Sequence, residues 1–323
     1  MNILVIGSGA REHSIIWALR KSKESKKIFC IPGNAGIGNI AECYELNLNN
    51  KREVFEFCLD NKIDLVVIGP EEYLEKGLSD YLNRKGINVF GPSKKAAKLE
   101  SSKIFSKKFL KKNNIPTAES KSFTSYNAAI KYLEKVNYPV VIKADGLAAG
   151  KGVFICNDFE ESKSNVKKLL INYELGKSGK KILIEDFING FEISYFAFVD
   201  KKTFIPFGYA LDHKRAYDND LGPNTGGMGC FTPSKKVTKK ILDEIKNKVV
   251  KPTISGIKKG NFIFRGILFF GLMISKTGPY VIEYNVRFGD PECQTLMRNL
   301  KSDLLDIINA CIRDKLFEKK ISL

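Results

Sequence analysis

Histidine is scarce in this sequence, since His13 and His213 are the only two among 323 residues. A zinc site built from several histidines is therefore excluded. The seven cysteines are scattered and include no C-x-x-C pair. This pattern is typical of reduced thiols in a cytosol rather than of a disulfide framework, so we expect a cytoplasmic protein.

Long apolar runs are also missing. No stretch approaches the roughly 20 residues of a membrane span. The N-terminus, MNILVIGSG, has neither the basic leader nor the small-residue cleavage site of a signal peptide. It is typical of a buried strand followed by a tight turn, and we expect no membrane partner.

Acidic residues are outnumbered by basic ones, 36 to 53, which gives a formal net charge of +17. A basic surface can indicate nucleic-acid binding, and a steep salt dependence of binding to DNA or RNA would identify it. However, no aromatic residues alternate with the basic ones as on a single-strand-binding surface. The lysines lie mostly at helical surface spacing, as in 235–240. We therefore expect anionic small-molecule substrates and no nucleic-acid partner.

The chain is longer than a single hydrophobic core usually supports, so two or three domains are expected. In its first part, short apolar strands alternate with helical patterns, which predicts a parallel sheet wound in the Rossmann manner. The first turn, 7–12, is one glycine short of G-x-G-x-x-G, and the second strand ends without the acidic residue that binds a ribose. A dinucleotide is therefore not expected, whereas an anion at the helix N-terminus, assisted by Arg11, is. The turn GPE at 69–71 follows a strand at the same sheet edge.

A helical pattern over 94–113, broken near 100–101, leads into a compact α+β segment that ends near Glu185. This segment contains the glycine-rich loop KADGLAAGKG at 143–152, with a lysine at each end. Small residues let backbone N–H groups approach phosphate oxygens, and lysine supplies charge. The loop is not a Walker A motif, because the G-K-[ST] order and the following helix are missing. Phosphate binding is favoured over an ordinary hairpin loop with surface lysines.

Two polar segments follow. Residues 186–190 are typical of a hinge, with Glu185 and Glu192 on either side. The segment 212–229 has many turn residues and little apolar content, so it is either an ordered loop with a function or a flexible one. Asp212 and His213 are neighbours on a strand and point to opposite faces, which favours a positioning role over an acid–base pair. Helical periodicity returns over 235–257 and again near 302–315.

The stretch VIEYNVRFGDPE at 281–292 follows an apolar run and a turn, as in a hairpin. Side chains alternate along a strand, so Glu283, Asn285 and Arg287 share one face. A carboxylate, an amide oxygen and a guanidinium in one row suit a hard cation together with an anion such as phosphate. The alternative is a half-buried edge strand whose polar face meets water.

Taken together, these parts are what ATP phosphoryl transfer between two lobes requires: lysines beside the phosphates, metal ligands and a lid that excludes water. At this point the sequence resembles the ATP-grasp superfamily and, within it, the family of phosphoribosylamine–glycine ligases, also called glycinamide ribonucleotide synthetases. The likeness runs from residue 3 to about residue 305. Its motifs are GSGAREH (7–13), PGNAG (32–36), GPS (91–93), KADGLAAGKG (143–152), DHKR (212–215), GPNTGGMG (222–229) and RFGDPE (287–292).

The resemblance implies an α/β and α+β fold, in which an N-terminal Rossmann-like parallel-sheet domain (1–101) precedes a two-lobed ATP-grasp domain. The core lobe would comprise 102–121 and 190–323, and the smaller lid lobe 122–189. The implied reaction joins glycine to 5-phosphoribosylamine at the expense of ATP, through a glycyl phosphate, in purine biosynthesis. Its products are glycinamide ribonucleotide, ADP and phosphate. The family also implies small-molecule partners only and a monomer in full-length form.

The resemblance assigns roles by position. Glu283 and Asn285 would bind Mg²⁺ or Mn²⁺, and Arg287, Lys143 and Asp212 would be the catalytic residues. The implied ATP-binding residues are Lys103, Lys143, Gly150, Lys151, Gly152, Glu185, Asp186, Phe187, Ile188 and Glu192. The implied substrate-binding residues are Gly9, Arg11, Glu12, Asp212, Lys214, Asn224, Thr225 and Arg287.

Two departures from the superfamily pattern stand out. The strand 268–273 offers no second metal-binding carboxylate, and the chain stops soon after the helix that leads into the family's C-terminal domain. A truncated chain that binds nucleotide but turns over poorly is therefore the alternative function. Another ATP-grasp ligase acting on a phosphoribosyl substrate is the nearest enzyme alternative, and DHKR and GPNTGGMG disfavour it.

Overall fold

Five short parallel strands form the N-terminal sheet. The computed structural model describes residues 1–148, 151–218 and 221–323. The strands are β1 (Asn2–Gly7), β2 (Lys27–Pro32), β3 (Glu42–Cys43), β4 (Leu65–Ile68) and β5 (Asn88–Phe90), paired in the order β3-β2-β1-β4-β5. The central strand is fully buried from Ile3 to Ile6, as expected where helices cover both faces of a parallel sheet. The predicted Rossmann-like sheet is confirmed.

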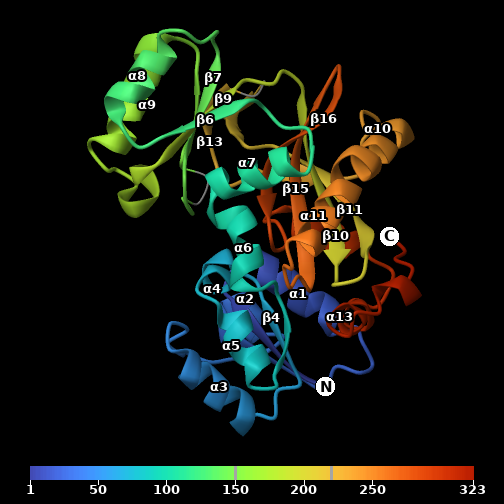
Figure 1. The fold of residues 1–323 in the computed structure, drawn as a ribbon. Coiled ribbons are helices and arrows are strands. Elements are labelled where there is room, and N and C mark those ends of the chain that lie inside the picture. The colour runs from blue at the N-terminus through green and yellow to red at the C-terminus, as the bar shows by residue number, and fades with distance from the viewer. Residues whose placement is uncertain (149–150, 219–220) are drawn as a thin grey trace.

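Short helices connect these strands and continue beyond them. They are α1 (Ala10–Leu19), α2 (Ala35–Gly38), α3 (Lys51–Asp60), α4 (Glu71–Glu75), α5 (Leu78–Arg84), α6 (Lys94–Ser101) and α7 (Lys103–Lys112). The predicted break in the 94–113 helix lies at Ser102, whose hydroxyl accepts a hydrogen bond from the Phe105 amide and so caps α7. Helices α6 and α7 connect the N-terminal domain to the small and large lobes described below (Figure 1).

The small lobe is an antiparallel sheet covered by two helices. It contains β6 (Ser120–Phe123), α8 (Tyr126–Leu133), β7 (Val140–Ala144), β8 (Val153–Cys156), α9 (Phe159–Leu170), the 3₁₀ turn η1 (Gly176–Lys180) and β9 (Ile182–Asp186). The strand order is β6-β9-β7-β8. Its apolar side chains form a cluster of their own. In Figure 1 this green lobe stands apart at the upper left.

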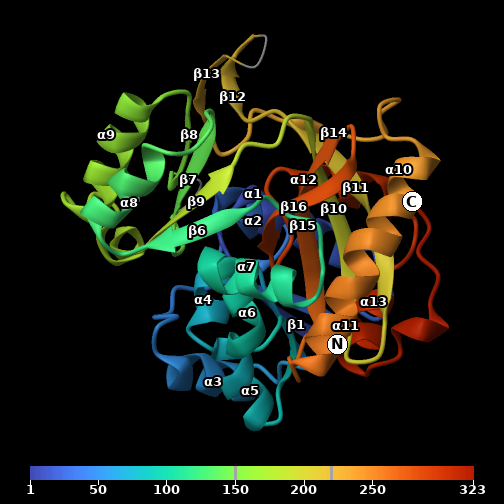
Figure 2. The same ribbon diagram turned by 45° about the horizontal axis from the view of Figure 1, so that its top comes forward.

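The large lobe is built on a second antiparallel sheet. Its strands are β10 (Phe191–Val199), β11 (Phe204–Asp212), β14 (Cys230–Phe231), β15 (Gly266–Ser275) and β16 (Gly278–Asn285), in the order β14-β11-β10-β15-β16. A separate pair, β12 (Arg215–Tyr217) and β13 (Leu221–Asn224), projects above it (Figure 2). The helices are α10 (Lys239–Glu244), α11 (Lys251–Lys259), α12 (Glu292–Asn299) and α13 (Leu304–Ile312), with a last 3₁₀ turn η4 (Leu316–Glu318).

The helical region predicted over 235–257 differs in detail. It starts at Lys239, and the π-helical turn η3 (Ile245–Val250) separates α10 from α11. Pro252 stands at the start of α11 and has no N–H to donate, which removes one rung of the regular hydrogen-bond ladder there. A locally widened turn accommodates that missing donor. Among the described residues, no helix is both long and apolar enough to cross a membrane.

An aromatic cluster joins the N-terminal sheet to the large lobe. Phe90 of β5 lies 6.0 Å, centroid to centroid, from Phe198 of β10. Phe198 in turn packs edge-on against Phe207 at 5.0 Å and Phe288 at 6.1 Å. The N-terminal domain and the large lobe therefore share a core. The predicted domain limits at 101/102, 121/122 and 189/190 stay predictions.

This shared core generates a prediction about stability. Replacing the fully buried Phe198 by alanine would leave a cavity at the junction, and we expect the free energy of unfolding to fall by about 3–5 kcal/mol. Urea unfolding followed by circular dichroism measures the change. Leu59→Ala, at a side chain that is 55% exposed, is the control and should alter stability little. An unchanged midpoint for Phe198→Ala would show that the cluster does not hold the two parts together.

Candidate functional site

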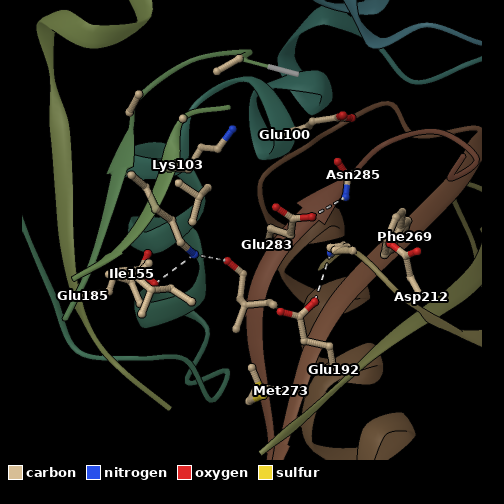
Figure 3. A pocket seen from close by; sticks show the side chains of 18 of the residues that line it. Glu100, Lys103, Ile155, Glu185, Glu192, Asp212, Phe269, Met273, Glu283 and Asn285 are labelled. Atoms are coloured by element: carbon tan, nitrogen blue, oxygen red, sulfur yellow. Dashed lines mark hydrogen bonds and ion pairs between the residues drawn. The ribbon is translucent and has the colours of Figure 1, made fainter. Parts of the chain in front are cut away.

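A cleft between the two lobes collects most of the residues that the sequence singles out (Figure 3). The small lobe contributes β7, β8, β9 and the glycine-rich loop, and the large lobe contributes β11, β15 and β16. The predicted residues that line it are Lys103, Lys143, Gly152, Glu185, Asp186, Phe187, Ile188, Glu192, Asp212, Lys214, Thr225, Glu283, Asn285 and Arg287. Residues far apart in the sequence thus meet in one place.

The hinge end of the cleft has a buried carboxylate between two lysines. Glu185 is 3% exposed, and its Oε2 lies 3.1 Å from Lys143 Nζ and 3.3 Å from Lys107 Nζ. Its other oxygen, Oε1, has no hydrogen-bond partner among the described residues. Asp186, Phe187 and Ile188 follow directly and line the cleft. An unpartnered buried acceptor beside a hinge is a suitable contact for an amino group of a ligand.

The glycine-rich loop is tied to the start of α7. Asp145 accepts hydrogen bonds from the Ser102 hydroxyl at 2.9 Å and the Ile104 amide at 3.0 Å. Lys103 Nζ donates to the Gly146 carbonyl at 3.0 Å. Small residues at this loop are required, because a Cβ on Gly146 would overlap Ser178. Lys151 is exposed and does not line the cleft, and Gly150 lies outside the described residues.

Two side chains with oxygen atoms that can bind a metal lie next to each other at the end of β16. Glu283 Oε1 accepts a hydrogen bond from Asn285 Nδ2 at 3.2 Å, and both side chains face the cleft (Figure 3). Burial alone would raise the pKa of Glu283, but Lys214, Lys103 and Lys143 more than offset it and hold that pKa below its usual range. The charged carboxylate and the amide oxygen suit Mg²⁺ or Mn²⁺, which prefer oxygen ligands.

The structure explains why position 271, opposite Glu283, carries no second acid. Gly271 of β15 pairs with Glu283 across the hairpin, and a Cβ on Gly271 would lie 2.7 Å from Glu283 Cγ. Among the described residues there is no cluster of three His, Cys, Asp or Glu side chains that could hold a metal. A cation bound at Glu283 and Asn285 would therefore take most of its ligands from phosphate oxygens and water.

Arg287 has internal partners on every side. Its Nε lies 3.1 Å from Glu71 Oε2 and its Nη2 lies 2.9 Å from Glu100 Oε1, while Nη2 also donates to Asn285 Oδ1 at 3.3 Å. Nη1 donates to the Phe288 carbonyl at 3.2 Å. Burial would lower the pKa of Arg287, but Glu100 and Glu71 outweigh it and raise that pKa, so the guanidinium stays charged. Arg287 thus fixes the amide of Asn285 as well as facing the cleft.

The polar segment after β11 supplies the opposite wall. Lys214 Nζ lies 3.1 Å from Glu192 Oε2, and Thr225 donates its hydroxyl hydrogen to the Lys214 carbonyl. Asp212 Oδ1 is buried and has no partner among the described residues. Burial, reinforced by Glu292, raises the pKa of Asp212 to about 6. The backbone of Asn224 lies in β13, and its side chain is outside what the structure describes.

His213 follows directly after β11, which ends at Asp212, so the two residues are not neighbours on a strand as predicted. Its ring stacks on Phe231 at a centroid distance of 5.7 Å, and Asp212 lines the cleft. The two residues therefore do not form an acid–base pair in this structure. In its described parts, 212–218 and 221–229, the segment forms short strands at 215–217 and 221–224, and Asp212, Lys214 and Thr225 line the cleft. Its functional role stays a prediction.

The turn at the start of α1 differs from expectation. Glu12 is 1% exposed, and its carboxylate accepts hydrogen bonds from the Gly9 amide at 2.7 Å and from Arg11 Nε at 2.6 Å. The carboxylate fills the space beside Gly7 and Gly69, where a Cβ would overlap it. The protein's own anion therefore stands at the turn where we expected an anion of the substrate. Gly9, Arg11 and Glu12 do not line the cleft, and their binding role stays a prediction.

Sequence reasoning missed several charged residues of the site. Glu71, Glu100, Asp290 and Glu292 line the cleft, and Lys107 lies behind Glu185. The turn at 69–71 was a usable signal for Glu71, because it ends a strand at the same edge of the sheet as the first turn. Glu100 and Lys107 gave no signal, since their partners are distant in the sequence.

The cleft is acidic although the protein is strongly basic. Among the described residues, nine carboxylates line it, namely Glu71, Glu100, Glu185, Asp186, Glu192, Asp212, Glu283, Asp290 and Glu292, against the four cations Lys103, Lys143, Lys214 and Arg287. Carboxylates crowded in this way favour ligands that bring positive charge, such as a metal complex or an amine.

Comparisons with known proteins agree with this geometry. The family model of the phosphoribosylglycinamide synthetase N domain matches residues 1–100, and that of its ATP-grasp (A) domain matches residues 101–293. A phosphoribosylamine–glycine ligase from Caldanaerobacter subterraneus subsp. tengcongensis is 46% identical over 321 residues, which cover 99% of this chain and 77% of that relative. One from Clostridium acetobutylicum is 45% identical over 98% of this chain and 76% of the relative.

Solved structures show the same relationship. The crystal structure of a phosphoribosylamine–glycine ligase from Thermotoga maritima has a TM-score of 0.85 at 33% identity, covering 97% of this chain and 76% of that one. A biotin carboxylase from Campylobacter jejuni has a TM-score of 0.75 at 16% identity, which shows a shared fold alone. The chain spans about three quarters of the length of the ligases it matches.

The raised pKa of Asp212 generates a prediction about pH. The pKa of Asp212 is about 6 in the folded chain and about 3.9 in the unfolded chain. Its contribution to stability is therefore fully present below about pH 3.9 and is lost as the pH rises through about 6. Asp212→Asn removes the charge, so we expect it to stabilise the protein by about 1–3 kcal/mol above pH 6 and by less than about 0.5 kcal/mol near pH 4.

Thermal unfolding from pH 4 to pH 8 tests this expectation. Asp186→Asn is the matched control, because Asp186 lies in the same cleft but is exposed. A pH-independent difference between Asp212→Asn and the wild-type chain would contradict the assigned environment.

Proposed function

The chain belongs to the phosphoribosylamine–glycine ligase family of purine biosynthesis, and from this premise we propose how its cleft carries out the reaction. The chain ligates glycine to 5-phosphoribosylamine with ATP and gives glycinamide ribonucleotide, ADP and phosphate through glycyl phosphate. The proposal rests on one observation: Lys103 and Lys143, which can bind phosphate, line the same cleft as the Glu283–Asn285 pair and the hinge that follows Glu185. We further propose that the chain acts in the cytoplasm, where its seven scattered cysteines would stay reduced, and as a monomer, as the family resemblance implies.

ATP lies between the lobes in this proposal. Its adenine sits against the hinge at Asp186–Ile188, with the unpartnered Glu185 Oε1 accepting from the amino group. Glu192 stands on the same wall for the ribose hydroxyls. Lys103 and Lys143 contact the phosphates, covered by the loop that includes Gly152, and Lys151 and Gly150 belong to the same loop. Enclosure by this loop keeps water from the acyl phosphate.

Phosphoryl transfer takes place near the end of β16. A carboxylate oxygen of glycine attacks the γ-phosphorus, the bond from that phosphorus to the β,γ-bridging oxygen breaks, and ADP leaves with the electron pair. Glu283 and Asn285 are the residues that would hold Mg²⁺ or Mn²⁺, which supplies charge neutralisation on the phosphates when bound. Arg287 orients Asn285 and offers positive charge to the glycyl group.

Amide formation completes the reaction. The amine of 5-phosphoribosylamine attacks the carbonyl carbon of glycyl phosphate, the C–O bond to phosphate breaks, and the nitrogen loses a proton. Asp212 is our candidate acceptor for that proton, because its Oδ1 is free among the described residues and its pKa is raised to about 6 by burial. Lys214, Thr225 and Asn224 border the same wall and position the substrate. The turn at Gly9, shaped by Arg11 and Glu12, bounds the phosphoribosylamine end.

The reaction itself is tested by measuring ADP release from the chain with ATP, Mg²⁺, glycine and phosphoribosylamine generated in place. Because the acyl phosphate must be captured by the amine, we expect sustained release only when all four components are present. Each component is omitted in turn as a control. ADP release that is indifferent to glycine, or to phosphoribosylamine, would contradict the proposed ligation.

The metal assignment is tested at Glu283. Glu283→Gln keeps the shape but removes the charge of the carboxylate, so we expect kcat to fall by roughly 100-fold and the Mg²⁺ concentration for half-maximal rate to rise by 10–100-fold. A titration of rate against Mg²⁺ and Mn²⁺ measures both. Glu244→Gln, on the outer surface beside Lys248, is the control. An unaltered Mg²⁺ requirement in Glu283→Gln would refute the assignment.

A further inference from the structure

Lys107 is a buried charge that the proposed reaction does not use. It lies one helical turn after Lys103 on α7, is 5% exposed, and has three acceptors for its three ammonium hydrogens. These acceptors are Thr117 Oγ1 at 2.5 Å, the Ala118 carbonyl at 3.2 Å and Glu185 Oε2 at 3.3 Å. A buried lysine is held in one position when each of its three ammonium hydrogens has an acceptor.

The same carboxylate oxygen also holds Lys143. Lys143 Nζ lies 3.1 Å from Glu185 Oε2 and donates to the Ile282 carbonyl at 2.9 Å. In this position the ammonium is directed at the hinge and the β16 backbone. To contact the phosphates of ATP as proposed, it must exchange these partners for phosphate oxygens.

This exchange leaves Glu185 with one fewer cation. A buried carboxylate resists the loss of a cationic partner, because an uncompensated charge in the interior is destabilising. Lys107 remains at the carboxylate after Lys143 has left, because Lys107 is anchored independently by Thr117 and Ala118. Thr117 is itself fixed, since its hydroxyl donates to the Val281 carbonyl of β16 at 2.7 Å.

We propose that Lys107 is a positioning residue of the nucleotide site, which neutralises Glu185 so that Lys143 is free to bind the ATP phosphates. The inference rests on the proposed function, because it assumes that ATP occupies this cleft. The burial of Lys107, which lowers its pKa to about 8 despite Glu185, fits a lysine held away from water. Without Lys107, Glu185 would keep Lys143 at the hinge.

The test compares Lys107→Met with wild-type chain in direct binding of Mg²⁺–ATP, followed by displacement of a fluorescent ATP analogue. We expect ATP affinity to fall by roughly tenfold or more, because a charge-assisted contact to phosphate is lost. The KM for ATP should rise by the same factor, and kcat should fall as well because Lys143 is kept from the phosphates, whereas the KM for glycine should change little. Lys111→Met is the matched control, since it removes the same charge from the same helix at an exposed pair with Glu119.

A second background separates this role from a merely structural one. In Glu185→Gln the competing carboxylate is gone while an acceptor oxygen remains for adenine. Adding Lys107→Met to it should therefore change ATP affinity by less than about twofold. An equal loss in both backgrounds, or no loss in the wild-type background, would overturn the proposal.

Two further outcomes are decisive. If Lys107→Met does not fold, Lys107→Gln takes its place, because its amide can still donate to Thr117 Oγ1 or the Ala118 carbonyl without carrying charge; unchanged ATP affinity there would overturn the proposal. A wild-type chain that binds no ATP would overturn the proposed function as well. Normal wild-type binding that Lys107→Met leaves unchanged would overturn only the role of Lys107.

Discussion

The joint between the lobes depends on one buried charge. Glu185 is almost completely buried, so water cannot solvate its negative charge. The ion pairs with Lys107 and Lys143 neutralise that charge instead. Lys107 comes from α7 and Lys143 from β7, while Lys143 also reaches the β16 backbone at Ile282. The carboxylate thus links the small lobe to α7 through Lys107 and, through Lys143, to the large lobe.

Missing side chains are as important as charges in placing the site. Gly271 leaves room for Glu283 across the hairpin, and Gly190 allows the chain after the hinge to pass against the Ile274 carbonyl, which a Cβ would overlap. Gly69 leaves room for the Glu12 carboxylate, which closes the N-terminal turn with an internal anion. At each place a glycine lets a carboxylate or a carbonyl approach the backbone, so the cleft is shaped by close backbone packing as well as by its functional groups.

The sequence predicted the parts that depend on local pattern. The alternation of β1 to β5 with helices and the hairpin that carries Glu283 and Asn285 follow from neighbouring residues. So does the break predicted near 100–101, which lies at Ser102. The partners of Arg287 were not predictable, because Glu71 and Glu100 lie 216 and 187 positions away and only the folded chain brings them together. The position of the Glu12 carboxylate at the first turn was not predictable for a related reason, and the binding role of that turn stays a prediction. The glycines indicated an anion there, but pattern alone does not say whether the anion is a ligand or Glu12.

The balance of charge suggests why such a basic protein has an acidic cleft. A net charge of +17 attracts anions such as ATP to the molecule at long range, whereas the carboxylates along the cleft oppose any anion that arrives without cations. A nucleotide complexed with metal meets both conditions, because its phosphates are partly neutralised before they reach Lys103 and Lys143. The same carboxylates favour an amine substrate on the Asp212 side.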